Sequence, residues 1–181
     1  MRIIAGQWRG RLLTAPPGLS TRPTADRVRQ ALFDMLIHAP WGGAGLFEGA
    51  AVLDAFAGSG ALGLEALSRG AAQVTFIERE RDALAALRRN IELCRAGDKA
   101  RIIPGDVMNP PSGAPCRVLF LDPPYGQNLA PPALTALRGA GWLERDAVIV
   151  LESGRDEAVP ELGTEVASRV HGAARLTIWR G

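Results

Sequence analysis

From Ala51 to the C-terminus, short apolar runs alternate with stretches in which apolar residues recur at helical spacing. Five runs are almost continuously apolar, as in strands buried on both faces: residues 51–56, 74–78, 101–103, 118–122 and 148–151. Helical patterns between them occupy about residues 60–69, 82–95 and 130–140. Buried strands separated by helices predict a parallel sheet with both faces covered, so the predicted fold class is α/β.

The last two apolar runs, residues 165–170 and 175–179, have no helical pattern between them. They flank His171-Gly172-Ala173, a short segment typical of a turn. This pair predicts an antiparallel hairpin at one edge of the sheet.

The first 41 residues carry a different pattern. Ile3-Ile4 and Leu12-Leu13 lie on either side of a glycine-containing centre, residues 6–10, which predicts a β-hairpin. Further on, Thr24 is predicted to cap a helix that ends near His38, because apolar residues recur there at helical spacing. A glycine-rich linker follows, so we expect an N-terminal extension over residues 1–41 and a core over residues 42–181.

The composition is that of a one-domain intracellular protein. A chain of 181 residues is long enough to bury a single core without metal or disulfides. Cys94 and Cys116 form no C-x-x-C pair, which excludes a zinc ribbon and a disulfide scaffold, so we expect no metal and a reducing, cytoplasmic location. The sequence has neither a signal-peptide region nor an apolar stretch long enough to span a membrane.

The net charge of +2 is unevenly distributed. Residues 1–41 hold six arginines and two aspartates, or +4, whereas the remainder sums to −2. A basic extension favours contact with a polyanion, although a solvated arginine-rich face explains the charge equally well.

A strand-turn-helix motif runs from Asp54 to Gly63, in which Gly58, Gly60 and Gly63 match G-x-G-x-x-G. Glycines let a ligand approach the backbone, and the amides of such a turn face the ligand. Proteins that bind NAD, FAD or S-adenosylmethionine all use this turn. A tight corner without any ligand would also explain the glycines.

Two acidic residues follow the next strands. Glu78 lies 20 residues after Gly58, where a carboxylate can accept hydrogen bonds from the ribose hydroxyls of an adenosine-containing ligand. A solvated charge at a helix start is the alternative. Asp106 follows the third strand and could reach an adenine amino group, although an ordinary turn aspartate explains it nearly as well.

The most specific motif is Asp122-Pro123-Pro124-Tyr125, directly after the fourth strand. Two prolines stiffen the backbone and leave carbonyl oxygens as acceptors. Asp122 and the Pro123 carbonyl could bind the amino group of a nucleobase while Tyr125 stacks on its ring. Ligands bind at strand ends in such sheets, so a chance polar loop is the weaker interpretation.

Four segments together resemble the RsmD family of bacterial 16S ribosomal RNA guanine-N2 methyltransferases, and the similarity covers nearly the whole chain. They are RIIAGQWRGR (residues 2–11), RPTADRVR (residues 22–29), FAGSGALGLEALSRG (residues 56–70) and DPPY (residues 122–125). Residues 42–48 and 109–116 match no family pattern, and we expect both to be surface loops.

The resemblance implies a Rossmann-like class I methyltransferase with a seven-stranded, mostly parallel sheet and an N-terminal hairpin-and-helix extension. It implies S-adenosylmethionine as cofactor and 16S rRNA, within the small ribosomal subunit or an assembly intermediate, as partner. The target guanine would lie at Asp122, Pro123, Pro124 and Tyr125. The residues expected at the cofactor are Asp54, Phe56, Gly58, Ser59, Gly60, Glu78 and, at its adenine, Asp106.

A paired base cannot reach such a pocket, so the target must be unpaired or turned out of its stack. The residues expected to contact RNA are Arg2, Trp8, Arg9, Arg11 and Arg22. An ordinary packed tryptophan is an equally good interpretation of Trp8.

Other functions fit the same motifs. The proline pair also serves amino-methyltransferases that act on adenine or cytosine in DNA or other RNA, and relatives that methylate glutamine. The glycine turn would suit an NAD-binding oxidoreductase, and the basic extension would suit a noncatalytic RNA-binding assembly factor.

Overall fold

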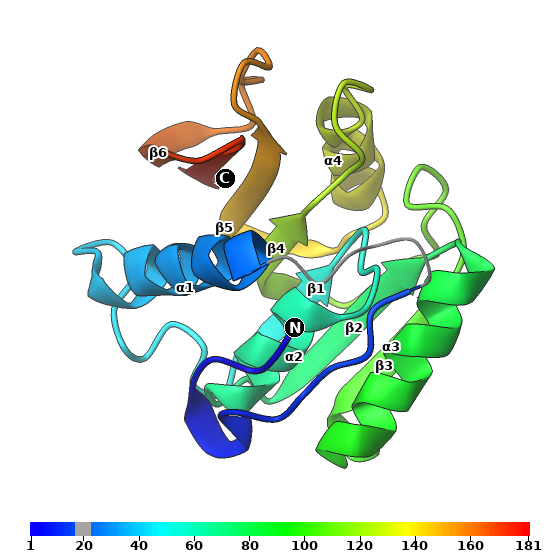
Figure 1. The fold of residues 1–181 in the computed structure, drawn as a ribbon. Coiled ribbons are helices and arrows are strands. Elements are labelled where there is room, and N and C mark those ends of the chain that lie inside the picture. The colour runs from blue at the N-terminus through cyan, green and yellow to red at the C-terminus, as the bar shows by residue number, and fades with distance from the viewer. Residues whose placement is uncertain (17–22) are drawn as a thin grey trace.

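The computed structural model describes residues 1–16 and 23–181, with the backbone alone at residues 23–25. Within them, seven strands form one sheet in the order β3-β2-β1-β4-β5-β7-β6 (Figure 1). The strands are β1 (Ala51–Asp54), β2 (Gln73–Glu78), β3 (Ala100–Pro104), β4 (Cys116–Leu121), β5 (Leu143–Gly154), β6 (Thr164–His171) and β7 (Ala174–Arg180).

Strands β1 to β5 are mutually parallel, and β7 lies antiparallel between β5 and β6. This arrangement confirms the α/β prediction and the antiparallel C-terminal pair. From β1 the chain builds outward through β2 to β3, and it then returns to place β4 on the other side of β1. In sheets of this kind, ligands bind outside the carboxyl ends of the strands at such a reversal of strand order, which here falls at β1 and β4.

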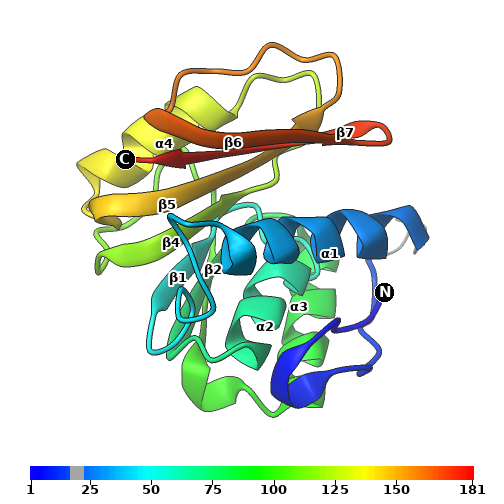
Figure 2. The ribbon, with the colours of Figure 1, turned by 90° about the vertical axis from the view of Figure 1, so that its left-hand side faces the viewer.

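Alternation of side chains along each strand produces two hydrophobic layers. One layer contains Val52, Phe76 and Phe120 and is covered by α1 (Pro23–His38), α2 (Ala61–Ser68) and α3 (Arg81–Cys94). The opposite layer, with Leu53 and Leu119, is covered by α4 (Ala130–Gly139). Figure 2 shows α1, α2 and α3 grouped away from α4. None of the helices in the described part of the chain is long and apolar enough to cross a membrane.

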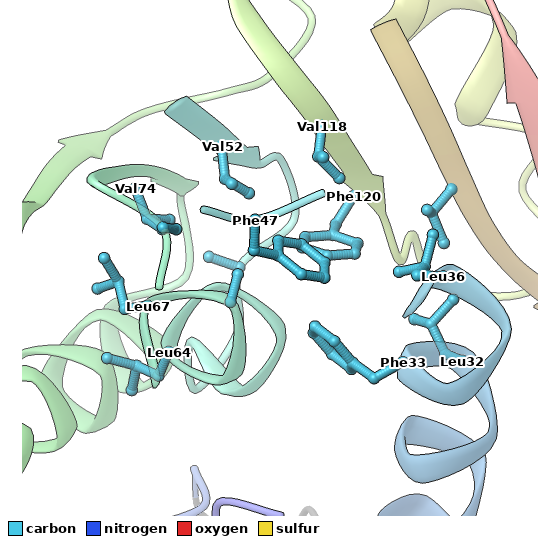
Figure 3. Close-up of a cluster of buried hydrophobic side chains, with 14 of the residues drawn as sticks. Leu32, Phe33, Leu36, Phe47, Val52, Leu64, Leu67, Val74, Val118 and Phe120 are labelled. Atoms are coloured by element: carbon cyan, nitrogen blue, oxygen red, sulfur yellow. The ribbon is translucent and has the colours of Figure 1, made fainter. Parts of the chain in front are cut away.

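The first layer also includes a residue from a segment that we expected to be a surface loop. Phe47 is fully buried, with its ring centroid 5.3 Å from that of Phe33 on α1. Figure 3 shows both rings beside Phe120 of β4. The surface prediction for residues 42–48 was therefore wrong at Leu46 and Phe47, because this connection fills the space between α1 and the sheet. The other loop, residues 109–116, ends at Cys116, which is buried as the first residue of β4.

The N-terminal segments pair antiparallel, but over a shorter length than two strands. They form one isolated bridge, Arg2 to Leu12, and the amide of Ile3 donates to the carbonyl of Arg11 at 2.9 Å. Residues Gly6–Trp8 form a 3₁₀ turn, η1. Helix α1 begins at Pro23, one residue before the predicted cap Thr24, and ends at His38 as predicted. Proline suits the first turn because a helix needs no amide donor there.

Candidate functional site

Four carboxylates line the carboxyl edge of the sheet on adjacent strands. In spatial order they are Glu78 of β2, Asp54 of β1, Asp122 after β4 and Glu152 of β5. Each follows by two residues a strand position in the layer under α1, α2 and α3: Phe76, Val52, Phe120 and Val150. Because strand side chains alternate, all four carboxylates face the same side of the sheet. This edge therefore favours cationic ligands and hydrogen-bond donors.

The glycine turn between β1 and α2 contains two different kinds of glycine. A Cβ at Gly63 would lie 2.3 Å from the Phe76 ring, so this glycine allows α2 to pack closely on β2. Gly58 has a φ of +54° and a Cβ there would meet nothing within 4 Å. Gly60, at φ +78°, precedes the first residue of α2. The open space at Gly58 leaves its backbone accessible to a ligand.

Glu78 is held against this turn. Its Oε2 accepts the Gly58 amide at 2.7 Å, and Oε1 accepts the amides of Arg79 and Glu80, each at 2.7 Å. The side chain is 9% exposed, so it is not the solvated charge that the alternative interpretation required. A carboxylate oxygen has two acceptor positions, which leaves Oε2 able to accept one hydroxyl hydrogen.

Asp54 is buried and its Oδ2 accepts the Gly63 amide at 2.9 Å. Its pKa is raised to about 7 overall: burial raises the pKa most, the Gly63 hydrogen bond lowers it, and the charge of Glu78 raises it. The observed partner of Asp54 is therefore the glycine turn itself. Of the other predicted cofactor residues, Phe56 packs against the layer under α4, and the buried Ser59 hydroxyl lies 3.7 Å from the Met1 sulfur.

Asp106 caps its own turn by accepting the Met108 amide at 2.9 Å. It also lies 3.6 Å from the Arg79 guanidinium, and its side chain is exposed. The neighbouring Gly105 amide donates to the Glu78 carbonyl at 2.9 Å. The structure thus brings the Asp106 loop next to Glu78. The hydrogen bond to the Met108 amide is the one that an ordinary turn aspartate would make, as in the alternative interpretation.

Residues 122–125 form a loop between the glycine turn and β5. Asp122 is open to solvent on one side and enclosed by protein elsewhere. This enclosure raises the pKa of Asp122 well above its ordinary value, and the charges of Glu152 and Asp54 raise it further. Pro123 is buried, whereas Pro124 and Tyr125 are exposed. The exposed Tyr125 ring offers a stacking surface beside the carboxylate of Asp122.

Two carboxylates hold the loop of residues 122–125 in place: Glu152, near the end of β5, and Glu157, after β5. The sequence analysis identified neither of them. The Tyr125 hydroxyl donates to Oε1 of Glu152 at 2.8 Å, and the Gly126 amide donates to Oε1 of Glu157 at 2.7 Å. Burial and the Glu152 carboxylate raise the pKa of Tyr125, so the phenol keeps its proton. The sequence signal for Glu152 was its position directly after Leu151, which matches that of Asp122 after Leu121.

A second missed cluster anchors the N-terminal segment to α2. The buried Glu65 accepts the amides of Ile4 and Ala5 at 2.7 and 3.0 Å and pairs with Arg69 at 2.8 Å. Ser68 accepts the Trp8 amide at 3.0 Å. A glutamate between Leu64 and Leu67 of an apolar helix was the available signal, because a buried charge requires partners.

The predicted RNA residues lie in two places. Trp8, Arg9 and Arg11 belong to the η1 turn region, which packs at the C-terminal end of α2, away from the carboxyl edge (Figure 1). Beside it is a cavity of about 210 Å³, lined in part by Trp8, Arg11 and Lys99. Arg2 is exposed, and its carbonyl accepts a hydrogen bond from Arg29 of α1. Arg22 lies outside the described residues.

A larger, open cavity of about 680 Å³ lies on the β5 side of the loop formed by residues 122–125, lined by residues that include Gly154, Glu157 and Gly172. It therefore adjoins the Gly126–Glu157 contact rather than the glycine turn. No group of three or more histidine, cysteine, aspartate or glutamate side chains that could hold a metal ion occurs in residues 1–16 and 23–181.

Comparisons with known proteins give consistent results. The family model described as conserved hypothetical protein 95 matches residues 1–180. "Ribosomal RNA small subunit methyltransferase D" of Escherichia coli (strain K12) is 43% identical over 162 residues, which cover 88% of this chain and 78% of that protein. The Haemophilus influenzae protein of the same name is 36% identical over 187 residues, covering 99% of this chain and 93% of the relative.

Solved structures agree with these relatives. The Escherichia coli protein yhhF superposes with a TM-score of 0.83 at 40% identity, covering 99% of this chain and 97% of that chain. The rRNA methyltransferase aviRa from Streptomyces viridochromogenes, at 18% identity and a TM-score of 0.70, covers 94% of this chain and 90% of its own. At that identity aviRa shows a shared fold alone.

Proposed function

This chain belongs to the family described as conserved hypothetical protein 95, and we propose that it methylates the exocyclic N2 amine of one guanine in 16S rRNA. It is a methyltransferase by family and by fold. One observation supports the proposed target amine. The Asp122–Tyr125 loop follows β4, and β4 lies beside β1, which leads into the glycine turn, so the two segments meet where the strand order reverses. A methyl donor and an amine acceptor would meet at that place.

The residues present fit S-adenosylmethionine. The open space at Gly58 admits a ligand to the turn backbone, and the free acceptor position on Glu78 suits a ribose hydroxyl. The acidic edge suits the positive charge of a sulfonium. When bound, S-adenosylmethionine supplies an electrophilic methyl group. We assign Asp54 and Gly60 to shaping the glycine turn, and Phe56 and Ser59 to lining the cofactor site. We assign Asp106 to the part of the site that would hold the adenine of the cofactor.

The loop supplies what a weak nucleophile needs. The lone pair of a guanine amine is delocalised into the ring, so the protein must orient the amine. We assign Asp122 and the Pro123 carbonyl to accept its two hydrogens, and Tyr125 to stack on the base. These hydrogen bonds strengthen as positive charge develops on nitrogen, and the proton then leaves to Asp122 or water.

The same acidic edge repels phosphates, so another part of the protein must contact the sugar-phosphate backbone of the RNA. We propose that the extension, residues 1–41, provides them through Arg2, Trp8, Arg9, Arg11 and Arg22, while residues 42–181 perform the chemistry. The partner is 16S rRNA in the small subunit or its assembly intermediate. This substrate, together with two free buried cysteines, supports a cytoplasmic location.

Calorimetric titration with S-adenosylmethionine and with NAD tests the proposal. We expect saturable binding of S-adenosylmethionine that Glu78→Ala weakens, and no binding of NAD. Binding of NAD alone would support an oxidoreductase and contradict the proposal. Methyl transfer to DNA rather than to small-subunit rRNA would contradict the assigned substrate.

A further inference from the structure

Glu152 stands beside Asp122 because of the register between β4 and β5. Leu121 pairs with Leu151 in parallel, so the next residue of each chain segment faces the same side of the sheet. Neighbouring strands lie about 4.8 Å apart, which places two carboxylates at the proposed target position rather than one.

The hydrogen bonding of Glu152 leaves one of its oxygens for a ligand. Its Oε1 accepts the Tyr125 hydroxyl at 2.8 Å, which also fixes the orientation of the ring. Among the described residues, Oε2 accepts no hydrogen bond. Burial raises the pKa of this half-buried side chain, whereas the Tyr125 hydrogen bond and the positive charge of Arg29 on α1 lower it.

We propose that Oε2 of Glu152 accepts the N1–H of the target base, so that Glu152 selects guanine. This inference rests on the proposed function. Guanine presents two adjacent donors, N1–H and the 2-amino group, which a row of acceptors from Glu152, Asp122 and Pro123 would bind. Adenine and cytosine present an acceptor nitrogen next to their amine, and that nitrogen would face a carboxylate. An acceptor nitrogen that faces a carboxylate leaves both groups unpaired and repels it, and this cost in binding free energy discriminates strongly against adenine and cytosine.

The test replaces the target guanosine by 2-aminopurine in reconstituted small subunits. 2-Aminopurine keeps the 2-amino group, but its N1 is an acceptor. We expect the native protein to prefer guanosine in kcat/KM by at least roughly 100-fold. Glu152→Gln should reduce this preference by about 10-fold or more, because the amide can keep its oxygen on Tyr125 and donate from nitrogen to N1 of 2-aminopurine.

Glu157→Gln is the matched control. It makes the same charge change at the residue that binds the Gly126 amide, and it should affect both substrates alike. An unchanged preference in Glu152→Gln would overturn the role of Glu152 alone. A native protein that shows no preference for guanosine over 2-aminopurine would also overturn the role of Glu152, even if the Glu152→Gln variant did not fold. Failure of the native protein to methylate the guanosine substrate would instead contradict the proposed function.

Discussion

At the scale of single residues, the site is defined by carboxylates in unlike environments. Glu78 is saturated with backbone amides at one oxygen, Asp54 is buried against the glycine turn, and Asp122 is open on one side. The sequence predicted that Glu78 and Asp122 end apolar strands and that Asp54 opens the strand-turn-helix motif, and so placed all three near the carboxyl ends of strands. It could not show their partners, because those depend on how the loops close.

Asp122→Asn should lower kcat for methyl transfer by roughly 100- to 1000-fold, since an amide oxygen is a weaker acceptor for the amine than a carboxyl group and cannot take up its proton. Affinity for S-adenosylmethionine should change little, because Asp122 is assigned to the target base. Single-turnover transfer and cofactor titration measure the two effects. Asp156→Asn, the same change at an exposed position on the loop after β5, should retain normal kcat. Equal kcat in both variants would remove Asp122 from the mechanism.

Asp54 should make stability depend on pH. Burial raises its pKa from 3.8 to about 7. Between these values the folded chain holds a proton that the unfolded chain has released, so the free energy of unfolding falls as pH rises through this window, by up to roughly 4 kcal/mol. Asp54→Asn still accepts the Gly63 amide but does not titrate. Urea unfolding from about pH 4 to 8 should therefore show a smaller decline for Asp54→Asn, and parallel curves would contradict this account.

At the scale of elements, the glycine turn serves two purposes: one glycine allows α2 to pack on β2, and another leaves the backbone open to a ligand. The sequence predicted the strand, the turn and the helix, because apolar periodicity and glycine spacing are local signals. It did not separate the glycines by role, since that depends on Phe76 of β2, which packs against Gly63 but not against Gly58. For the same reason it missed Phe47, whose burial requires α1 to pack on the sheet.

Alanine at the two glycines should therefore produce opposite defects. Gly63→Ala places a Cβ against Phe76 and should lower the free energy of unfolding by about 1–3 kcal/mol. Gly58→Ala enters open space and should cost only about 1 kcal/mol for its positive φ, while it weakens S-adenosylmethionine binding because the new Cβ faces the ligand. Thermal unfolding and calorimetry separate the two. Equal cofactor affinity in Gly58→Ala and the native protein would refute the cofactor assignment.

At the scale of the whole molecule, the proposed site of methyl transfer and the predicted RNA contacts are separated. The η1 turn lies at the far end of α2, whose eight residues span about 12 Å from the glycine turn. Trp8 therefore cannot stack on a base held by Asp122, and any RNA contact at Trp8 involves a different nucleotide. The charge distribution predicted a basic extension, but only the anchor at Glu65 shows which edge of the sheet it reaches.

Replacing Arg9 and Arg11 together by alanine should weaken binding to small subunits and reduce the slope of log K against log salt by about 0.7–0.9 for each phosphate that is no longer neutralised. Cofactor affinity should not change. Alanine at Arg145 and Arg169, two exposed arginines of β5 and β6, removes the same charge and should retain more of the salt dependence. Unchanged RNA affinity in the first variant would refute the extension as an RNA contact.

The most direct test of the central claim is mass mapping of modified guanines in 16S rRNA from cells that lack this protein and are complemented with the native chain or with Asp122→Asn. The account predicts N2-methylguanosine at one position with the native chain and unmodified guanosine at that position with the variant. Identical guanine modification in all samples, or full modification by Asp122→Asn, would contradict it.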